Sequence, residues 1–199
     1  MVPEFVIELI YAERYERQEA EICLKELRYG DRVLELGAGI GFIGSLAAKI
    51  CGSENVRTYE ANPSVEPIVR RTHKLNGVTP DLRMQAVTKA TGPIKFFVNE
   101  NVVSSSLKDR DFGGGITVDG IALKDAIADF RPTVIVCDIE GAEVDVFTAA
   151  ELSGVERILI ELHPKIVGTA ENEAFLKMLE DKGLRFAYGT REKVAFLKR

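Results

Sequence analysis

Residues 33–44 read VLELGAGIGFIG, and this stretch decides the fold. The apolar residues 33–36 predict a short buried strand, and the small and apolar residues from 42 to 51 predict a helix. Between them, Gly37, Gly39 and Gly41 allow the chain to turn sharply and let a ligand contact the backbone. A strand, a glycine-rich turn and a helix in this order are typical of cofactor sites in α/β proteins.

Apolar runs alternate with helical patterns along the rest of the chain, which predicts a mostly parallel sheet covered by helices on both faces. Further strands are expected at 56–60, 82–87, 133–137 and 157–162, and helices at 63–75, 123–130, 143–152 and 170–182. Short strands at 94–98 and 116–118 flank a polar loop. Segments 184–188 and 194–197 are expected to pair as an antiparallel hairpin at the sheet edge. Residues 1–29 predict a helical cap over the carboxyl edge, and residues 30–199 the main domain.

The composition disfavours several classes of partner. Lys plus Arg number 26 against 31 for Asp plus Glu, and no dense basic block is present, which argues against binding nucleic acid. The cysteines Cys23, Cys51 and Cys137 are far apart and in no CxxC spacing, so we expect neither a disulfide framework nor a zinc site. Neither a signal peptide nor a membrane span is predicted. We therefore expect a cytoplasmic protein with no membrane partner.

Two acids flank the glycine turn. Glu35 lies two residues before Gly37, and we interpret its carboxylate as a partner for the amino-acid ammonium of S-adenosylmethionine; it would repel the pyrophosphate of a dinucleotide. Glu60 ends the second predicted strand, where it could accept hydrogen bonds from both hydroxyls of a ribose. Gly39, Gly41 and Gly44 also fit a dinucleotide fingerprint, so an NAD(P)-dependent oxidoreductase is the alternative prediction.

A second group of polar residues follows the most apolar predicted strand. Asp138 and Glu140 are two residues apart, so they project to the same side at the expected ligand edge. His163 leaves the neighbouring strand. We predict these three residues as the catalytic group, because a carboxylate or imidazole within reach of an alcohol acceptor can remove its proton.

Neighbouring residues allow other roles. Glu143 either joins this group or favours the dipole of the helix that it starts. Asp138, Glu140, Glu161 and His163 offer hard ligands, but their spacing leads us to expect no metal. Tyr15 and Glu16 either close over the cofactor from the cap or belong to an amphipathic helix.

Several short motifs occur in an order that covers nearly the whole chain, and together they resemble the FkbM family of class I methyltransferases. The matching segments are Tyr15-Glu16, Gly30-Asp31, VLELGAGIGFIG, YEANP at 59–63, AV at 86–87, SSSL at 104–107, DGIAL at 119–123, DIEGAE at 138–143 and IELHP at 160–164. The family often has Asp where Glu35 stands and Asn where Ile40 stands.

The resemblance implies a three-layer, Rossmann-like class I methyltransferase sheet of seven strands and S-adenosyl-L-methionine as the cofactor. Together with the acids it predicts O-methylation of a hydroxyl on a small molecule or sugar. A third hypothesis is a non-catalytic cofactor-binding module, in which a cap helix would fill the space before Asp138. The predicted cofactor-binding residues are Glu35, Gly37, Ala38, Gly39, Gly41, Phe42, Glu60, Ala61, Asn62, Ala86, Val87 and Asp138.

Overall fold

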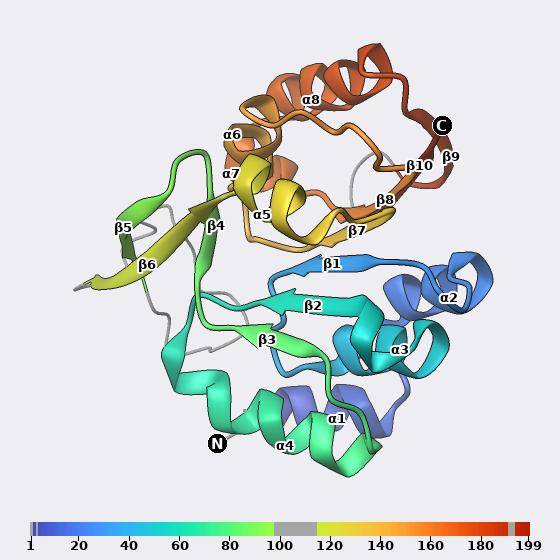
Figure 1. Cartoon of the computed structure of the whole chain (residues 1–199), viewed down its shortest axis with the longest axis vertical. Helices are drawn as coiled ribbons and strands as arrows, with labels where there is room; N and C mark the ends of the chain where they lie inside the picture. Colours follow the sequence, from blue (N-terminus) through green and yellow to red (C-terminus); the bar gives the residue numbers. More distant parts are fainter. Residues whose placement is uncertain (1, 3, 98–114, 191–193) are drawn as a thin grey trace.

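A computed structural model describes residues 2, 4–97, 115–190 and 194–199. Its centre is a seven-stranded sheet in the order β3-β2-β1-β7-β8-β10-β9 (Figure 1). The strands are β1 (Val33–Leu36), β2 (Val56–Tyr59), β3 (Asp81–Arg83), β7 (Val134–Cys137), β8 (Arg157–Glu161), β9 (Arg185–Gly189) and β10 (Val194–Lys198). Because β10 alone runs antiparallel, against both β8 and β9, the prediction of a mostly parallel sheet with an antiparallel C-terminal hairpin is confirmed.

Helices cover both faces of the sheet (Figure 1). One face carries α5 (Leu123–Phe130), α6 (Glu143–Thr148) and α8 (Thr169–Asp181), with the short α7 (Pro164–Val167) between β8 and α8. The other carries α2 (Arg17–Glu26) and α3 (Phe42–Cys51), and α4 (Glu66–Asn76) packs beside α3. Side chains of β1 alternate between the two layers, since Leu34 and Leu36 pack towards α5, α6 and α8 while Val33 packs towards α2 and α3.

The predicted strand at 82–87 is wrong as a single element. The chain leaves the main sheet after β3, and Ala86–Thr88 forms β4 in a second sheet with β5 (Gly92–Phe96) and β6 (Ile116–Ala122), in the order β4-β6-β5. A continuous apolar run does not reveal the sheet to which each half belongs. The predicted strand at 116–118 extends to Ala122, and the helix predicted at 143–152 ends at Thr148. The predicted polar loop through Ser104–Ser106 lies outside the described residues.

The N-terminal segment differs from the expected cap. It contains α1 (Glu4–Tyr11) and α2, and α2 lies on the same face of the sheet as α3 because Ile22, Cys23 and Leu27 bury their apolar side chains there. Only the connection between α1 and α2 reaches the carboxyl edge, where Tyr15 and Glu16 line a cavity. In the described ranges, no helix has both the length and the apolar character needed to cross a membrane.

The register of the parallel strands brings their carboxyl ends together. Leu36 pairs with Tyr59 on one side and with Cys137 on the other, so the chain leaves β1, β2 and β7 at the same level. Gly37 follows β1 with φ +88°, and a Cβ at this position would overlap the backbone carbonyl oxygen of Asp138. Glycine is therefore required where the two connections touch.

This contact predicts a difference between two glycines with nearly the same backbone conformation. Gly30 has φ +87° with no neighbour within 4 Å of an added Cβ. Gly30→Ala should cost about 1–2 kcal/mol of unfolding free energy for the left-handed conformation alone. Gly37→Ala should cost about 1–3 kcal/mol more because of the overlap. Urea unfolding of both variants measures the difference, and equal losses would show that the contact with Asp138 is not tight.

Candidate active site

A cavity of about 690 Å³, partly open to solvent, lies at the carboxyl edge of β1, β2 and β7 and is flanked by the second sheet. Its size is in the range of small-molecule sites. It is lined by Tyr15, Glu16, Gly37, Gly39, Tyr59, Glu60, Ala61, Gln85, Ala86, Val87, Phe96, Asp138, Ile139 and Glu140. No Lys or Arg is found among these described lining residues, so the wall is acidic.

Glu60 is held in the cavity wall by the backbone. Its Oε2 accepts a hydrogen bond from the Gly39 N–H at 2.9 Å, and its Oε1 accepts one from the Asn62 N–H at 2.7 Å. The side chain is buried, and burial raises the pKa of its carboxyl although these backbone hydrogen bonds oppose the shift. Each oxygen keeps acceptor capacity for a further donor, so the carboxylate is preorganised for a ligand that offers two hydroxyls.

The predicted cofactor-binding residues divide into two groups. The wall includes Gly37, Gly39, Glu60, Ala61, Ala86, Val87 and Asp138. The others support the wall from behind. The Ala38 N–H donates to the Tyr59 carbonyl, the Asn62 side chain caps the short helix that starts at Pro63, and Gly41 precedes α3. Phe42 packs edge-to-face against Tyr15, with ring centroids 5.8 Å apart.

The predicted orientation of Glu35 is wrong. Because side chains alternate along β1, Glu35 faces the α3 side together with Val33, and an oxygen of its carboxylate lies against Gly44 of α3. Only 2% of the residue is exposed, and it is not part of the cavity wall. Burial, and then the nearby negative charges of Glu16 and Glu60, raise the pKa of Glu35. Gly44, which has no side chain, provides the space for this acid.

Several lining residues were missed or left undecided by the sequence analysis. Tyr15 and Glu16 reach the cavity from the α1–α2 connection, and Gln85, Phe96 and Ile139 complete the wall. The YE pair had a signal in the family resemblance. The other three had none, because the bend after β3 and the second sheet bring them to the cavity.

Asp138 and Glu140 follow β7 and both line the cavity, as predicted. The Asp138 side chain is 36% exposed, yet its Oδ1 is buried and has no hydrogen-bond partner. Burial, together with the negative charges of Glu161 and Glu140, raises the pKa of Asp138 well above its usual range. Glu140 has φ 53°, a strained backbone conformation for a residue with a side chain, of the kind found at functional sites.

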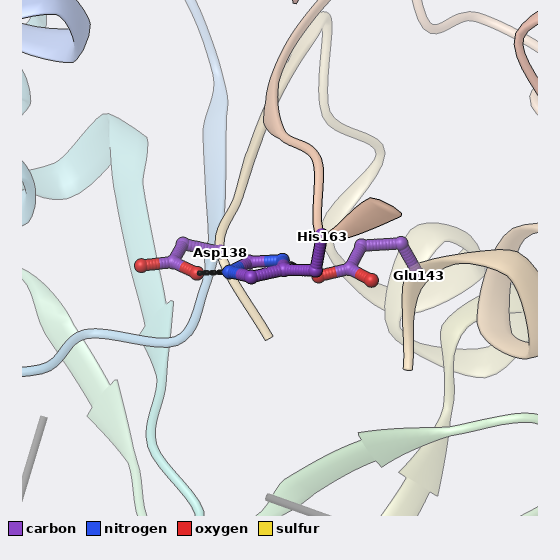
Figure 2. Close-up of side chains that lie close together, drawn as sticks. All are labelled: Asp138, Glu143 and His163. Carbon is purple, nitrogen blue, oxygen red and sulfur yellow. Dashed lines mark hydrogen bonds and ion pairs between the residues drawn. The ribbon is translucent and has the colours of Figure 1, made fainter. Parts of the chain in front are cut away.

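His163 lies behind these two acids and is not part of the cavity wall. Its Nε2 is 3.6 Å from Asp138 Oδ1 and 3.8 Å from Glu140 Oε2. On the other side of the ring, Nδ1 is 2.9 Å from Oε1 of Glu143, which also accepts a hydrogen bond from the Gly141 N–H. Figure 2 shows the imidazole between the carboxylates of Asp138 and Glu143. Only 2% of the Glu143 side chain is exposed, so this residue is a buried partner of His163.

The same three residues offer one ligand atom each within 4.8 Å of one another, which is close enough for a metal ion to be considered. The two carboxylates lie on opposite sides of the ring (Figure 2), and Glu143 is already the hydrogen-bond partner of Nδ1. The group therefore forms a row around the imidazole instead of a cage around one point. The absence of a metal stays a prediction.

No family model matches this chain, and no curated protein matches it either. Solved structures do. Precorrin-6y C5,15-methyltransferase from Geobacter metallireducens has a TM-score of 0.59 and 11% identity, over 100% of this chain and 93% of that chain. The ribosomal protein L11 methylase from Lactobacillus delbrueckii subsp. bulgaricus has a TM-score of 0.56 and 12% identity, over 94% and 79%.

A third match is fibrillarin from Aeropyrum pernix, solved with S-adenosyl-L-methionine bound, at a TM-score of 0.50 and 12% identity over 90% of this chain and 74% of that chain. The chain has the fold of these methyltransferases. At 11–12% identity the likeness shows the fold alone. The predicted Rossmann-like class I sheet is thereby confirmed, whereas the FkbM family stays a resemblance.

The hydrogen bond between Glu143 and His163 generates a prediction about protonation. Burial alone would lower the pKa of His163, but the hydrogen bond and the negative charges of Glu143, Glu140 and Glu161 raise it above the ordinary value. Glu143→Gln should lower this pKa, because the charged acceptor is replaced by a neutral one. The measurement is an NMR titration of the imidazole resonances.

The chain contains only two histidines, and the second provides the control. His73 is on α4, where burial and then Arg70 lower its pKa. Its titration should be the same in the wild type and in Glu143→Gln. An unchanged His163 titration in the variant would contradict the role assigned to Glu143.

Proposed function

We propose that this protein is an S-adenosylmethionine-dependent methyltransferase that methylates a hydroxyl group of a small molecule or sugar. The observation that carries the proposal is the cavity in which Glu60, held by two backbone N–H groups, stands beside the exposed glycine turn and across from Asp138. The fold shared with solved methyltransferases supports the same conclusion.

The cavity residues fit the methyl donor. The Glu60 carboxylate is suited to the two ribose hydroxyls, and the apolar side chains of Ala86, Val87 and Phe96 provide a surface for the adenine base. Gly37 and Gly39 allow the donor to pass close to the backbone. The acids on the wall favour a cationic ligand, and the donor carries both a sulfonium and an ammonium group.

The alternative of an NAD(P)-dependent oxidoreductase fits this wall less well. Both cofactors contain a ribose that Glu60 could bind, so this residue does not distinguish them. A pyrophosphate would have to lie beside Glu16 and Asp138, with no Lys or Arg among the described lining residues to compensate. Repulsion between like charges in a partly buried site disfavours that arrangement.

The residues after β7 support catalysis. S-adenosylmethionine, when bound, supplies an electrophilic methyl group. A raised pKa makes the Asp138 carboxylate a stronger base, so it can accept the hydroxyl proton as the acceptor oxygen attacks. His163 and Glu143 stand behind Asp138 and orient it. The cavity wall aligns the acceptor, which is the larger contribution to an in-line transfer.

The acidic wall also bears on the acceptor. The titles of the similar structures name a precorrin, a ribosomal protein and RNA among the targets of those enzymes. A polyanion such as RNA needs cationic side chains, and the chain has a net charge of −5. A neutral hydroxyl compound fits the acidic wall better. Asp138 is 36% exposed, so no cap helix fills the space in front of it, which disfavours a non-catalytic module.

Calorimetry with S-adenosylhomocysteine and with NAD tests the cofactor. The wild type should bind the former and not the latter, and Glu60→Ala should weaken binding by about 10- to 100-fold, because charge-assisted hydrogen bonds to the ribose are lost. Glu66→Ala removes an exposed acid that pairs with Arg70 on α4 and should bind normally. Tight binding of NAD without binding of S-adenosylhomocysteine would overturn the proposal.

Asp138→Asn tests the base. We expect the variant to bind S-adenosylhomocysteine with near wild-type affinity but to lose about 100-fold or more in turnover, because the amide cannot take a proton. Turnover is measured with a methyl-labelled donor and an acceptor found by screening hydroxylated compounds and sugars. Normal turnover in this variant would remove Asp138 from the mechanism.

A further inference from the structure

The connection between α1 and α2 has a strained backbone that aims two side chains at the cavity. Glu13 and Glu16 have φ of 55° and 45°, although neither is glycine. Such conformations cost about 1–3 kcal/mol each and persist where the surrounding structure requires them. Tyr15 packs on Phe42 at the start of α3, which anchors the connection over the glycine turn.

Glu16 lies directly over this turn. Its Oε1 would be 3.9 Å from a Cβ added to Gly39, and the Tyr15 hydroxyl would be 3.6 Å from the same point. Glu60 binds the N–H of the same glycine. The carboxylates of Glu16 and Glu60 are therefore both placed around Gly39, and both line the cavity.

The surroundings of Glu16 are strongly acidic. Glu19 of α2, Glu161 of β8, Asp138 after β7 and Glu35 of β1 all interact with its charge, and the Tyr15 hydroxyl donates a hydrogen bond to it. Arg14 and Arg17 line the outer hollow on the other side of Glu16 but not the cavity. Burial is the largest cause that raises the pKa of Glu16 to about 8, with the charges of Glu19 and Glu161 adding to it.

We propose that Glu16 is a donor-binding residue whose carboxylate pairs with the ammonium group of the methionine end of S-adenosylmethionine. This inference rests on the proposed function. It transfers to the α1–α2 connection the role that the sequence analysis assigned to Glu35, whose carboxylate faces α3. An ammonium group beside Glu16 compensates the excess of negative charge that Glu16, Asp138 and Glu161 otherwise share.

Proton release follows from this pairing. In the empty site at pH 7, Glu16 is mostly protonated because its pKa is about 8. The ammonium of the ligand favours the carboxylate, so the proton leaves Glu16 for the solvent as the ligand binds. Binding should therefore release close to one proton at pH 7. Affinity should rise by about tenfold for each pH unit up to about pH 8 and then level off.

The test compares two ligands in two isosteric variants. S-adenosylhomocysteine has the ammonium group, whereas 5′-methylthioadenosine has the same nucleoside without the amino acid. Glu16→Gln should weaken binding of S-adenosylhomocysteine by about 10- to 100-fold and leave 5′-methylthioadenosine within about twofold. Glu13→Gln changes an exposed acid in the same strained connection and should bind both ligands as the wild type does.

Calorimetry in buffers of different ionisation enthalpy counts the protons. The wild type and Glu13→Gln should release close to one proton with S-adenosylhomocysteine at pH 7, and Glu16→Gln should release far fewer. Equal losses of both ligands in Glu16→Gln would indicate a structural role and overturn the inference. So would wild-type affinity for S-adenosylhomocysteine in that variant. If the wild type binds neither ligand, the proposed function itself fails.

Discussion

The contact between the backbone at Gly37 and the carbonyl group of Asp138 constrains everything at the carboxyl edge. It exists because β1 and β7 are in parallel register and end at the same level, and because Gly37 has no side chain. The glycine turn after β1 and the acidic segment after β7 consequently form one continuous surface. Glu60 enters this surface from β2 through its hydrogen bond with Gly39. A ligand placed there contacts three strand ends at once, which is how a short chain assembles a complete cavity from segments far apart in sequence.

Charge is the second organising feature of the site. The described cavity wall contains acids from the N-terminal connection, from β2 and from the segment after β7, without a lysine or arginine. Burial and mutual repulsion raise the pKa values of Glu16, Glu60 and Asp138. Such a wall is electrostatically unsatisfied when empty and is stabilised by a cation. A positively charged methyl donor provides that compensation, and an acid with a raised pKa is also a stronger base.

The row of Glu143, His163 and Asp138 links the second layer of helices to the reacting edge (Figure 2). Glu143 is the first residue of α6 and is buried, and His163 follows β8 and precedes α7. The hydrogen bond at Nδ1 orients the ring so that Nε2 points towards Asp138. The packing of α6 on the sheet therefore sets the position of His163, and through it the electrostatic environment of Asp138.

The sequence alone was sufficient for the α/β class, the order of most strands, the antiparallel hairpin and the positions of Glu60 and Asp138 at strand ends. These features depend on local periodicity and on glycine, which are visible along the chain. Alternation along β1 required Glu35 to face one helical layer, but which layer depends on the packing of α2 and α3. The division of 82–87 between two sheets, the approach of Glu16 to Gly39 and the pairing of Glu143 with His163 likewise join segments distant in sequence. Only the tertiary structure decided them, because packing and charge act through space and leave no periodic signal in the chain.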